Sequence, residues 1–421
     1  MKRILILLVL MMLVIFGLYA AGQTEKASQK LVIAGETGSP QFMYYTSLGP
    51  EYTELTGVEL EFIEIPHDSM HERFVQESIS RSGAIDIYNA DQPWISEFAS
   101  HGWIEPLDEK ISVEDRDDFF EAAIDASSYQ GRLFAIPYFI HTPIVYYRTD
   151  LFEAAGLEVP QTWSDYRNAA KALTNSSTGM YGTIIEGKQS GEPVTHLIDW
   201  YFQNGAEFVD SAGNVVVDSP AAKEVFNFLL EMMYSDKSVM PGSIGYDNAD
   251  VHNLFMQGKV AMVKNWPYMY AMARDPNQSM VSDNFKIAKQ PAGKFESSAV
   301  WTWGFAISSS SKNKDAAWDF IEWATSAEKL AELGVKQLLP VPRHSSFEVV
   351  KNNETIPERD LDAIMIMSDA VTYGKNATES PVFPAIQSEM SVVLSKILSR
   401  QISVDEGLEE AKNSLKLLVE K

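Results

Sequence analysis

The 421-residue chain has no cysteine, few basic residues and, after its first segment, no long hydrophobic run. The absence of cysteine excludes disulfides, cysteine-ligated zinc, iron–sulfur clusters, thiol catalysis and a lipid anchor on an N-terminal cysteine. With 34 Lys and Arg against 58 Asp and Glu, the formal charge is −24. This acidity argues against binding nucleic acid, whose phosphates require Lys and Arg. The 45% hydrophobic content is sufficient for buried cores, and the length predicts two or three domains.

The first segment predicts export. Residues 1–3 are a short basic start, residues 4–18 are an apolar run, and residues 20–22 are small. This order is typical of a secretory signal peptide that is cleaved before Gln23. The alternative is an uncleaved anchor, because about 18 apolar residues is the lower limit for a membrane span. We expect residues 1–22 to be removed and the mature protein to be soluble and periplasmic.

Short apolar strands alternate with helices along the following part of the chain. Strands and helices are expected in turn at residues 31–35, 50–56, 58–65, 74–79 and 84–88. Such alternation predicts βαβ units and a mostly parallel sheet, with ligands bound at the carboxyl ends of the strands. A second α/β pattern follows residues 144–147, and residues 361–419 are mainly helical. The absence of a Gly/Ser linker suggests two α/β lobes with several chain crossings between them.

The sequence contains no phosphate-binding loop and none of the G-x-G-x-x-G, G-x-S-x-G and H-E-x-x-H motifs. His67 and His71 would share a helix face, but two ligands do not make a metal site. The acidic stretch 108–121 is interpreted as a solvated helix N-terminal region, favoured by the helix dipole, rather than as paired catalytic carboxylates. The sequence therefore favours a binding protein over an enzyme and predicts no metal and no cofactor.

Tryptophans beside turns indicate the class of ligand. Trp94, Trp266, Trp301 and Trp303 each lie near a predicted strand end, next to Pro, Gly or a polar residue. A sugar has an apolar C–H face and a polar rim, so its site combines flat aromatic rings with hydrogen-bonding side chains. The alternative for each Trp taken alone is partly buried packing.

Five stretches carry a family resemblance: residues 129–137 (YQGRLFAIP), 144–157 (IVYYRTDLFEAAGL), 254–262 (LFMQGKVAM), 303–321 (WGFAIS, then SKNKDAAWDFI) and 339–343 (LPVPR). Together they resemble, in order, the bacterial extracellular solute-binding proteins of family 1, which serve ABC sugar importers. Many relatives have a lipid-anchor cysteine. Its absence from this chain implies a freely diffusing form.

The resemblance implies an α/β fold of two lobes, the type II periplasmic binding fold, with a hinge of three crossovers. The crossovers are expected near residues 137–143, 300–303 and 339–343. The N-terminal lobe would comprise residues 23–138 plus 303–339, and the C-terminal lobe residues 139–302 plus 340–421. The ligand would lie in the cleft between the lobes, which close over it.

The resemblance also implies a set of ligand-binding residues in the cleft: Glu36, Asp91, Tyr138, His141, Trp266, Trp301, Trp303 and Arg343. Glu36 and Asp91 would accept hydrogen bonds from hydroxyls, and charge strengthens such bonds. Trp266 is expected to be the main stacking platform and Arg343 a donor at the third crossover. Replacing Trp266 by alanine is expected to lower affinity several tens-fold and to leave thermal stability nearly intact.

The function implied by the resemblance is capture without chemistry. A monomer would bind a carbohydrate or polyol, close through contacts made only in the closed state, and deliver the ligand to a membrane ABC permease. One alternative is a binder of another solute, such as a polyamine or another cation, which a cleft lined mainly by carboxylates would favour. The other is a secreted carbohydrate-active enzyme, which needs two facing carboxylates about 5–10 Å apart.

Overall fold

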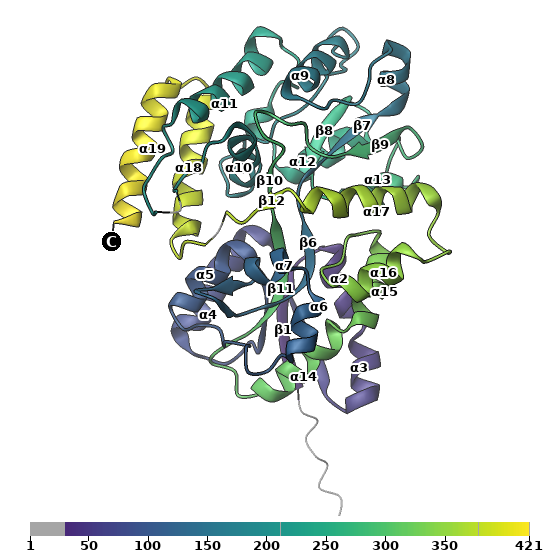
Figure 1. The fold of residues 1–421 in the computed structure, drawn as a ribbon, viewed down its shortest axis with the longest axis vertical. Helices are drawn as coiled ribbons and strands as arrows, with labels where there is room; N and C mark the ends of the chain where they lie inside the picture. Colours follow the sequence, from purple (N-terminus) through teal and green to yellow (C-terminus); the bar gives the residue numbers. More distant parts are fainter. Residues whose placement is uncertain (1–29, 211, 378, 421) are drawn as a thin grey trace, which may run out of the picture.

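The computed structural model describes residues 30–210, 212–377 and 379–420, so the predicted signal peptide lies outside the described residues. The chain forms two α/β lobes, one above the other in Figure 1, each built on its own sheet. Among the described helices, none is both long enough and apolar enough to cross a membrane.

The sheet of the first lobe has the strand order β2-β1-β3-β11-β6. Strand β1 (Lys30–Glu36) is parallel to β2 (Glu59–Ile65) and β3 (Ile87–Asp91), as the alternating sequence pattern predicts. Strands β11 (Trp301–Ile307) and β6 (Ile136–His141) continue the sheet in antiparallel pairing. Because β11 is antiparallel to both of its neighbours, β6 runs in the same direction as β1, β2 and β3. The sheet is therefore mostly parallel in strand direction, as predicted, and only β11, which arrives from the second lobe, is reversed.

Helices cover both faces of this sheet. They are α2 (Pro40–Ser47), α3 (Gly49–Thr56), α4 (His67–Ser80), α5 (Gln92–Ser100), α6 (Val113–Asp118), α7 (Glu121–Ala126), α14 (Lys314–Ala324), α15 (Ala327–Gln337) and α16 (His344–Lys351). A short hairpin joins β4 (Ser128–Tyr129) and β5 (Arg132–Leu133). One core contains Phe42, Tyr45 and Phe305, and a second core on the other face contains Phe74 and Phe98.

The second lobe has a three-stranded sheet in which β7 (Ile144–Arg148) lies between β8 (Met262–Asn265) and β9 (Phe285–Ala288), antiparallel to both. Its helices are α8 (Thr149–Ala155), α9 (Trp163–Ala172), α10 (Glu192–Asn204), α11 (Pro220–Leu230), α12 (Asn248–Met256), α13 (Met269–Arg274), α18 (Phe383–Leu398) and α19 (Val404–Val419), with a π-helical turn at Glu231–Ser235 and a 3₁₀ turn at Ser243–Gly245. The last two helices pack against α10 and α11.

Three connections link the lobes. The first runs from β6 directly into β7, and the second from β10 (Ser298–Ala299), which pairs with β12 (Gly374–Lys375), into β11. Helix α16 packs on α15 in the first lobe, while α17 (Glu358–Val371) packs on β9 and lies along the second lobe, next to the boundary. We therefore propose that the third crossing lies at residues 352–357 rather than at 339–343.

Candidate functional site

A cavity of about 440 Å³ lies between the two lobes and is lined by residues from both. Seven of the eight predicted ligand-binding residues line it: Glu36, Asp91, Tyr138, His141, Trp266, Trp301 and Trp303. Glu36 and Asp91 end the parallel strands β1 and β3. Parallel strands end at the same edge of a sheet, so the topology brings these two carboxylates into one wall.

His67 joins the carboxylates in this wall. It begins α4, directly after β2, and its Nε2 lies 3.3 Å from Asp91 Oδ2. Burial alone would lower the pKa of His67, but the hydrogen bond to Asp91 and the negative charge of Glu36 raise that pKa to about 10. His67 is therefore a cation at neutral pH. Burial raises the pKa of Glu36 to about 7, against the opposing effect of His67.

His67 and His71 do not converge on a metal. The Nε2 of His71 lies 2.5 Å from Glu97 Oε2, and its ring stacks on Phe98. His67 lines the cleft, whereas His71 does not. The two side chains therefore have separate acidic partners: His67 contacts Asp91, and His71 contacts Glu97.

Three indoles form the aromatic part of the wall. Trp303 is partly exposed and makes edge contacts with Trp94 and His67, at ring-centroid distances of 6.1 and 5.8 Å. Trp301 is only 2% exposed, and its ring stands at 87° to that of Trp266. Of these rings, Trp303 offers the most surface to a ligand.

Trp266 is held more tightly than the sequence suggested. It is 6% exposed, and its indole N–H donates to Glu192. Its ring packs edge-on against His141 at 4.8 Å, and its carbonyl accepts from the Tyr146 hydroxyl at 2.8 Å. Large buried rings contribute strongly to packing. The expectation that Trp266→Ala leaves stability nearly intact does not fit this packing.

Tyr138 and His141 lie at the base of the cleft on β6. The Tyr138 hydroxyl donates to Asn89 Oδ1 at 2.8 Å, so it orients the strand end rather than pointing to a ligand. Both ring nitrogens of His141 lack a hydrogen-bond partner among the described residues. Burial, aided by His196, lowers the pKa of His141 to about 3. A neutral imidazole can donate to one hydroxyl and accept from another.

The second-lobe wall was missed by sequence reasoning. It comes from helix starts and the loops before them: Lys188, Ser190, Glu192, Thr195, Asp247, Asn248, His252 and Tyr268. Lys188 Nζ pairs with Asp247 at 2.8 Å, and Tyr268 accepts a hydrogen bond from Asn248 at 2.8 Å. The capping box of α12, formed by Asp247 and Asp250, is a local signal that marks one of these positions.

Arg343 is the one predicted residue that the structure places elsewhere. Its guanidinium donates to Asp118 at 2.7 Å, to Asp115 and to the carbonyl of Thr325, and it lies over the ring of Phe119. It does not line the cleft. The two aspartates of α6, more than 220 residues earlier in the sequence, draw the side chain to the back of the first lobe. Arg343 is therefore a structural residue.

Replacing Arg343 by methionine is expected to lower the free energy of unfolding by about 2 kcal/mol, because it removes charge-assisted hydrogen bonds from a side chain that is 8% exposed. Ligand affinity should stay within about twofold. Urea unfolding and calorimetry measure both quantities. Arg132→Met, which removes a guanidinium that is 57% exposed, is the control and should change stability by less than about 0.5 kcal/mol. A large loss of affinity in Arg343→Met would contradict the structural role.

The cleft geometry agrees with what sequence comparison finds. The family model described as "Bacterial extracellular solute-binding protein" matches residues 28–331. The chain belongs to this family. Its members are binding proteins, and the two-lobe fold with an interlobe cleft is the architecture expected for one.

Individual relatives are similar over most of their length. The mannitol-binding protein of Pseudomonas aeruginosa is 26% identical over 374 residues, which cover 85% of each chain. A solute-binding protein from Agrobacterium radiobacter K84, solved with ribitol, superposes with a TM-score of 0.83 at 24% identity over 93% of this chain and 98% of that one. Maltose-bound MalE3 of T. maritima gives 0.84 at 20% identity over 92% and 99%. The solved structures establish the fold of this solute-binding protein.

Proposed function

We propose that the protein is the periplasmic solute-binding component of an ABC importer and captures a carbohydrate or polyol between its lobes. The observation that carries this proposal is the composition of the cleft. Three indoles, three imidazoles and five carboxylates border a cavity of about 440 Å³, within the size range of small-molecule sites. Flat apolar rings beside charged acceptors suit a ligand with a C–H face and many hydroxyls.

Several carboxylates of the cleft already have partners within the protein, whereas a polyamine site needs carboxylates that are free to pair with the ligand. Asp91 pairs with His67, Asp247 with Lys188, and Glu192 accepts from Trp266. These contacts give Asp91 and Asp247 a cationic partner each and give Glu192 a hydrogen-bond donor. A sugar or polyol, which is uncharged, fits such a wall better than a polycation does. The mannitol-binding relative and the ribitol-bound structure support the polyol class.

A thermal-shift screen tests the proposal. D-mannitol, ribitol, maltose and spermidine are each added to the mature protein at millimolar concentration. A ligand at about 100 times its Kd stabilises by about 2.7 kcal/mol, so a true ligand should raise Tm by several degrees. A shift with a polyol or sugar and none with spermidine is expected. A shift with spermidine alone would contradict the proposal, and hydrolysis of a glycoside would favour an enzyme.

Affinity for the ligand is expected to fall up to about tenfold between pH 8 and pH 6. Burial raises the pKa of Glu36 to about 7 in the free protein. Ligand hydroxyls that donate to Glu36 would favour its ionised form and lower that pKa, so binding releases a proton below pH 7. The groups that face Glu36 are His67, Asp91, Glu192 and Asp68. His67, with a pKa of about 10, stays protonated throughout this range.

Calorimetry in two buffers of different ionisation enthalpy measures both the affinity and the proton release. Glu36→Gln should bind more weakly and show a flat profile between pH 6 and pH 8. An unchanged pH profile in this variant would show that another group is responsible.

A further inference from the structure

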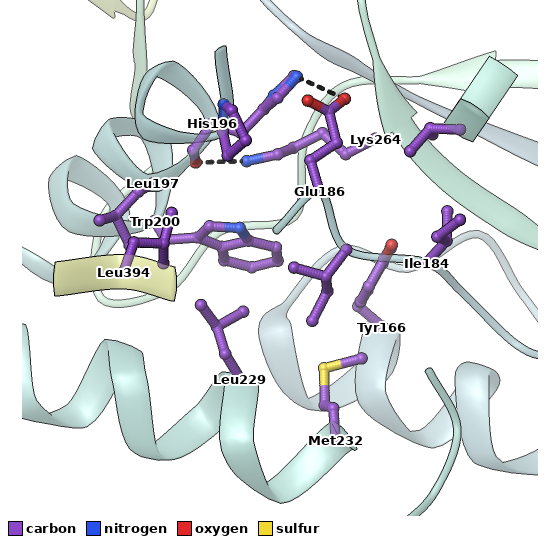
Figure 2. A pocket seen from close by; sticks show the side chains of 13 residues that line it. Tyr166, Ile184, Glu186, His196, Leu197, Trp200, Leu229, Met232, Lys264 and Leu394 are labelled. Atoms are coloured by element: carbon purple, nitrogen blue, oxygen red, sulfur yellow. Dashed lines mark hydrogen bonds and ion pairs between the residues drawn. The ribbon is translucent and has the colours of Figure 1, made fainter. Parts of the chain in front are cut away.

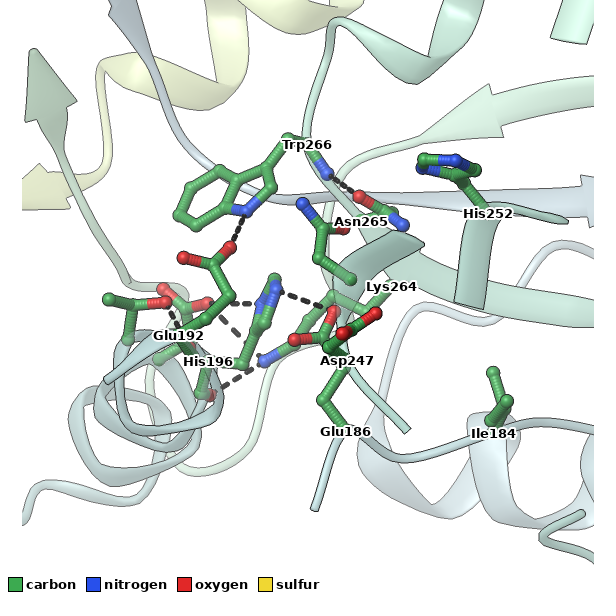
Figure 3. Close-up of polar contacts among 12 residues, drawn as sticks. Ile184, Glu186, Glu192, His196, Asp247, His252, Lys264, Asn265 and Trp266 are labelled. Carbon is green, nitrogen blue, oxygen red and sulfur yellow. Dashed lines mark hydrogen bonds and ion pairs between the residues drawn. The ribbon is translucent and has the colours of Figure 1, made fainter. Parts of the chain in front are cut away.

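Three side chains at the second-lobe wall and directly behind it have metal-binding chemistry, and of these only Glu192 lines the cleft. Glu192 and His196 lie four residues apart on α10 and therefore share one face of that helix. Glu186 reaches them from the loop before the helix, as Figure 3 shows. One ligand atom from each of the three side chains lies within 4.8 Å of the others. No metal was predicted from the sequence.

Two of the three side chains are buried without hydrogen-bond partners. Glu186 is 7% exposed and His196 is 6% exposed. Neither carboxylate oxygen of Glu186 and neither ring nitrogen of His196 makes a hydrogen bond with the described residues. A buried polar group without such a bond is costly, and a buried carboxylate is more costly still. A ligand that binds both groups would remove this cost.

The spacing of two of the three ligand atoms matches a shared ion. His196 Nε2 and Glu186 Oε1 lie 3.3 Å apart. Two ligands at about 2.0–2.1 Å from one tetrahedral zinc ion are about 3.4 Å apart. A small cavity of about 40 Å³, shown in Figure 2, is lined by Glu186, His196 and Lys264, whereas Glu192 lines the neighbouring cleft. This volume exceeds the roughly 10–15 Å³ that one water-sized occupant requires.

The cationic side chains near this cluster are paired with other acidic side chains. Lys264 also lies beside Glu186, but its ammonium pairs with Asp199 at 3.3 Å and donates to the carbonyl of His196. Lys188 is paired with Asp247, and His67 with Asp91. Glu186 and Glu192 are then the two acidic side chains of this cluster without a cationic side chain of their own, and a divalent cation would pair with both.

We propose that Glu186, Glu192 and His196 bind a divalent transition-metal cation of the zinc class. One imidazole nitrogen with two carboxylates suits zinc, whereas calcium and magnesium prefer oxygen ligands alone. Trp266 donates to one oxygen of Glu192 and leaves the other for the metal. The ion would tie the loop of Glu186 to α10 and hold Glu192 and Trp266 in the cleft wall.

Titration of the tag-free mature protein with ZnCl₂, after removal of metals with EDTA, tests this proposal. Calorimetry should show one equivalent bound, with no competition from millimolar Mg²⁺ or Ca²⁺. Glu186→Gln and His196→Gln should each weaken binding at least tenfold. His101→Gln, on the surface beside Trp103, is the matched control and should bind as the wild type does.

Co²⁺ provides a readout that does not depend on the variants. The wild-type protein should develop visible absorption bands at one equivalent of Co²⁺ and lose them when Zn²⁺ is added. Absence of both the heat and the bands would overturn the proposal, as would binding that is lost only in His67→Gln. Zinc is titrated without sugar, and the sugar screen is run in EDTA. A negative result in one experiment therefore does not contradict the proposal that the other experiment tests.

Discussion

Replacing Trp303 by alanine is expected to weaken binding of the sugar or polyol about thirtyfold. Trp303 is the most exposed of the three cleft indoles, and its ring is supported from behind by Trp94. A ring in this position loses water when a ligand covers it, so it has the character of a binding hot spot, which contributes about 2 kcal/mol or more. A loss of about 2 kcal/mol corresponds to roughly thirtyfold in Kd.

Calorimetry with the ligand identified by thermal shift measures this effect. Trp318→Ala is the matched control, because Trp318 is a partly buried indole on α14 that does not line the cleft. Its affinity should equal that of the wild type. Trp303→Phe keeps a flat ring and should recover part of the loss. Equal affinity in Trp303→Ala and wild type would show that the ligand does not stack on this ring.

Asp199→Ala is expected to lower the free energy of unfolding by about 3 kcal/mol. Asp199 is fully buried on α10, where it accepts from the backbone N–H of Ala299 at 2.9 Å and pairs with Lys264 at 3.3 Å. It therefore ties α10 to β8 and to the crossing strand β10. Removal of one partner of a buried ion pair leaves an uncompensated charge, which costs about 3–5 kcal/mol. We expect a loss at the lower end of this range, because Glu186 also lies near Lys264 and would still act on its charge in the variant.

A double variant separates the charge from the packing. Adding Lys264→Met to Asp199→Ala removes the uncompensated ammonium and should recover a large part of the stability. Asp362→Ala, on the exposed surface of α17, is the control and should change stability by less than about 0.5 kcal/mol. Urea unfolding in EDTA measures the free energy of unfolding of the wild type, Asp199→Ala, the double variant and Asp362→Ala. No recovery in the double variant would assign the loss to the hydrogen bond with Ala299.

The first-lobe half of the cleft could be read from the sequence because it follows from strand order. Glu36 and Asp91 each end a strand of recognisable pattern, and parallel strands end together. His67 occupies the equivalent place after β2. Its spacing from His71 predicted only a shared helix face, and not a place in the cleft. The indoles Trp266, Trp301 and Trp303 were found because the motifs around them are distinctive.

The second-lobe half depends on contacts between distant segments. Lys188, Glu192 and Asp247 lie in loops and helix starts whose local sequence resembles any solvated surface, and only the packing of α10 and α12 beside β8 turns them toward the cleft. Arg343 is the opposite case, because contacts with a distant segment keep a predicted residue out of the cleft. Its motif was expected at the third crossover, with the guanidinium in the cleft, but Asp115 and Asp118 decide where that guanidinium lies.

The sequence by itself determined the family and the two-lobe fold, because these depend on hydrophobic periodicity and on ordered local motifs, and it predicted the class of ligand. The tertiary structure decided which charges meet: the His67–Asp91 pair, the buried Lys264–Asp199 pair and the Glu186–Glu192–His196 cluster. Such pairings join residues that are far apart in the chain or on different turns. Their energies depend on distance and burial, and both quantities exist only after the lobes have packed.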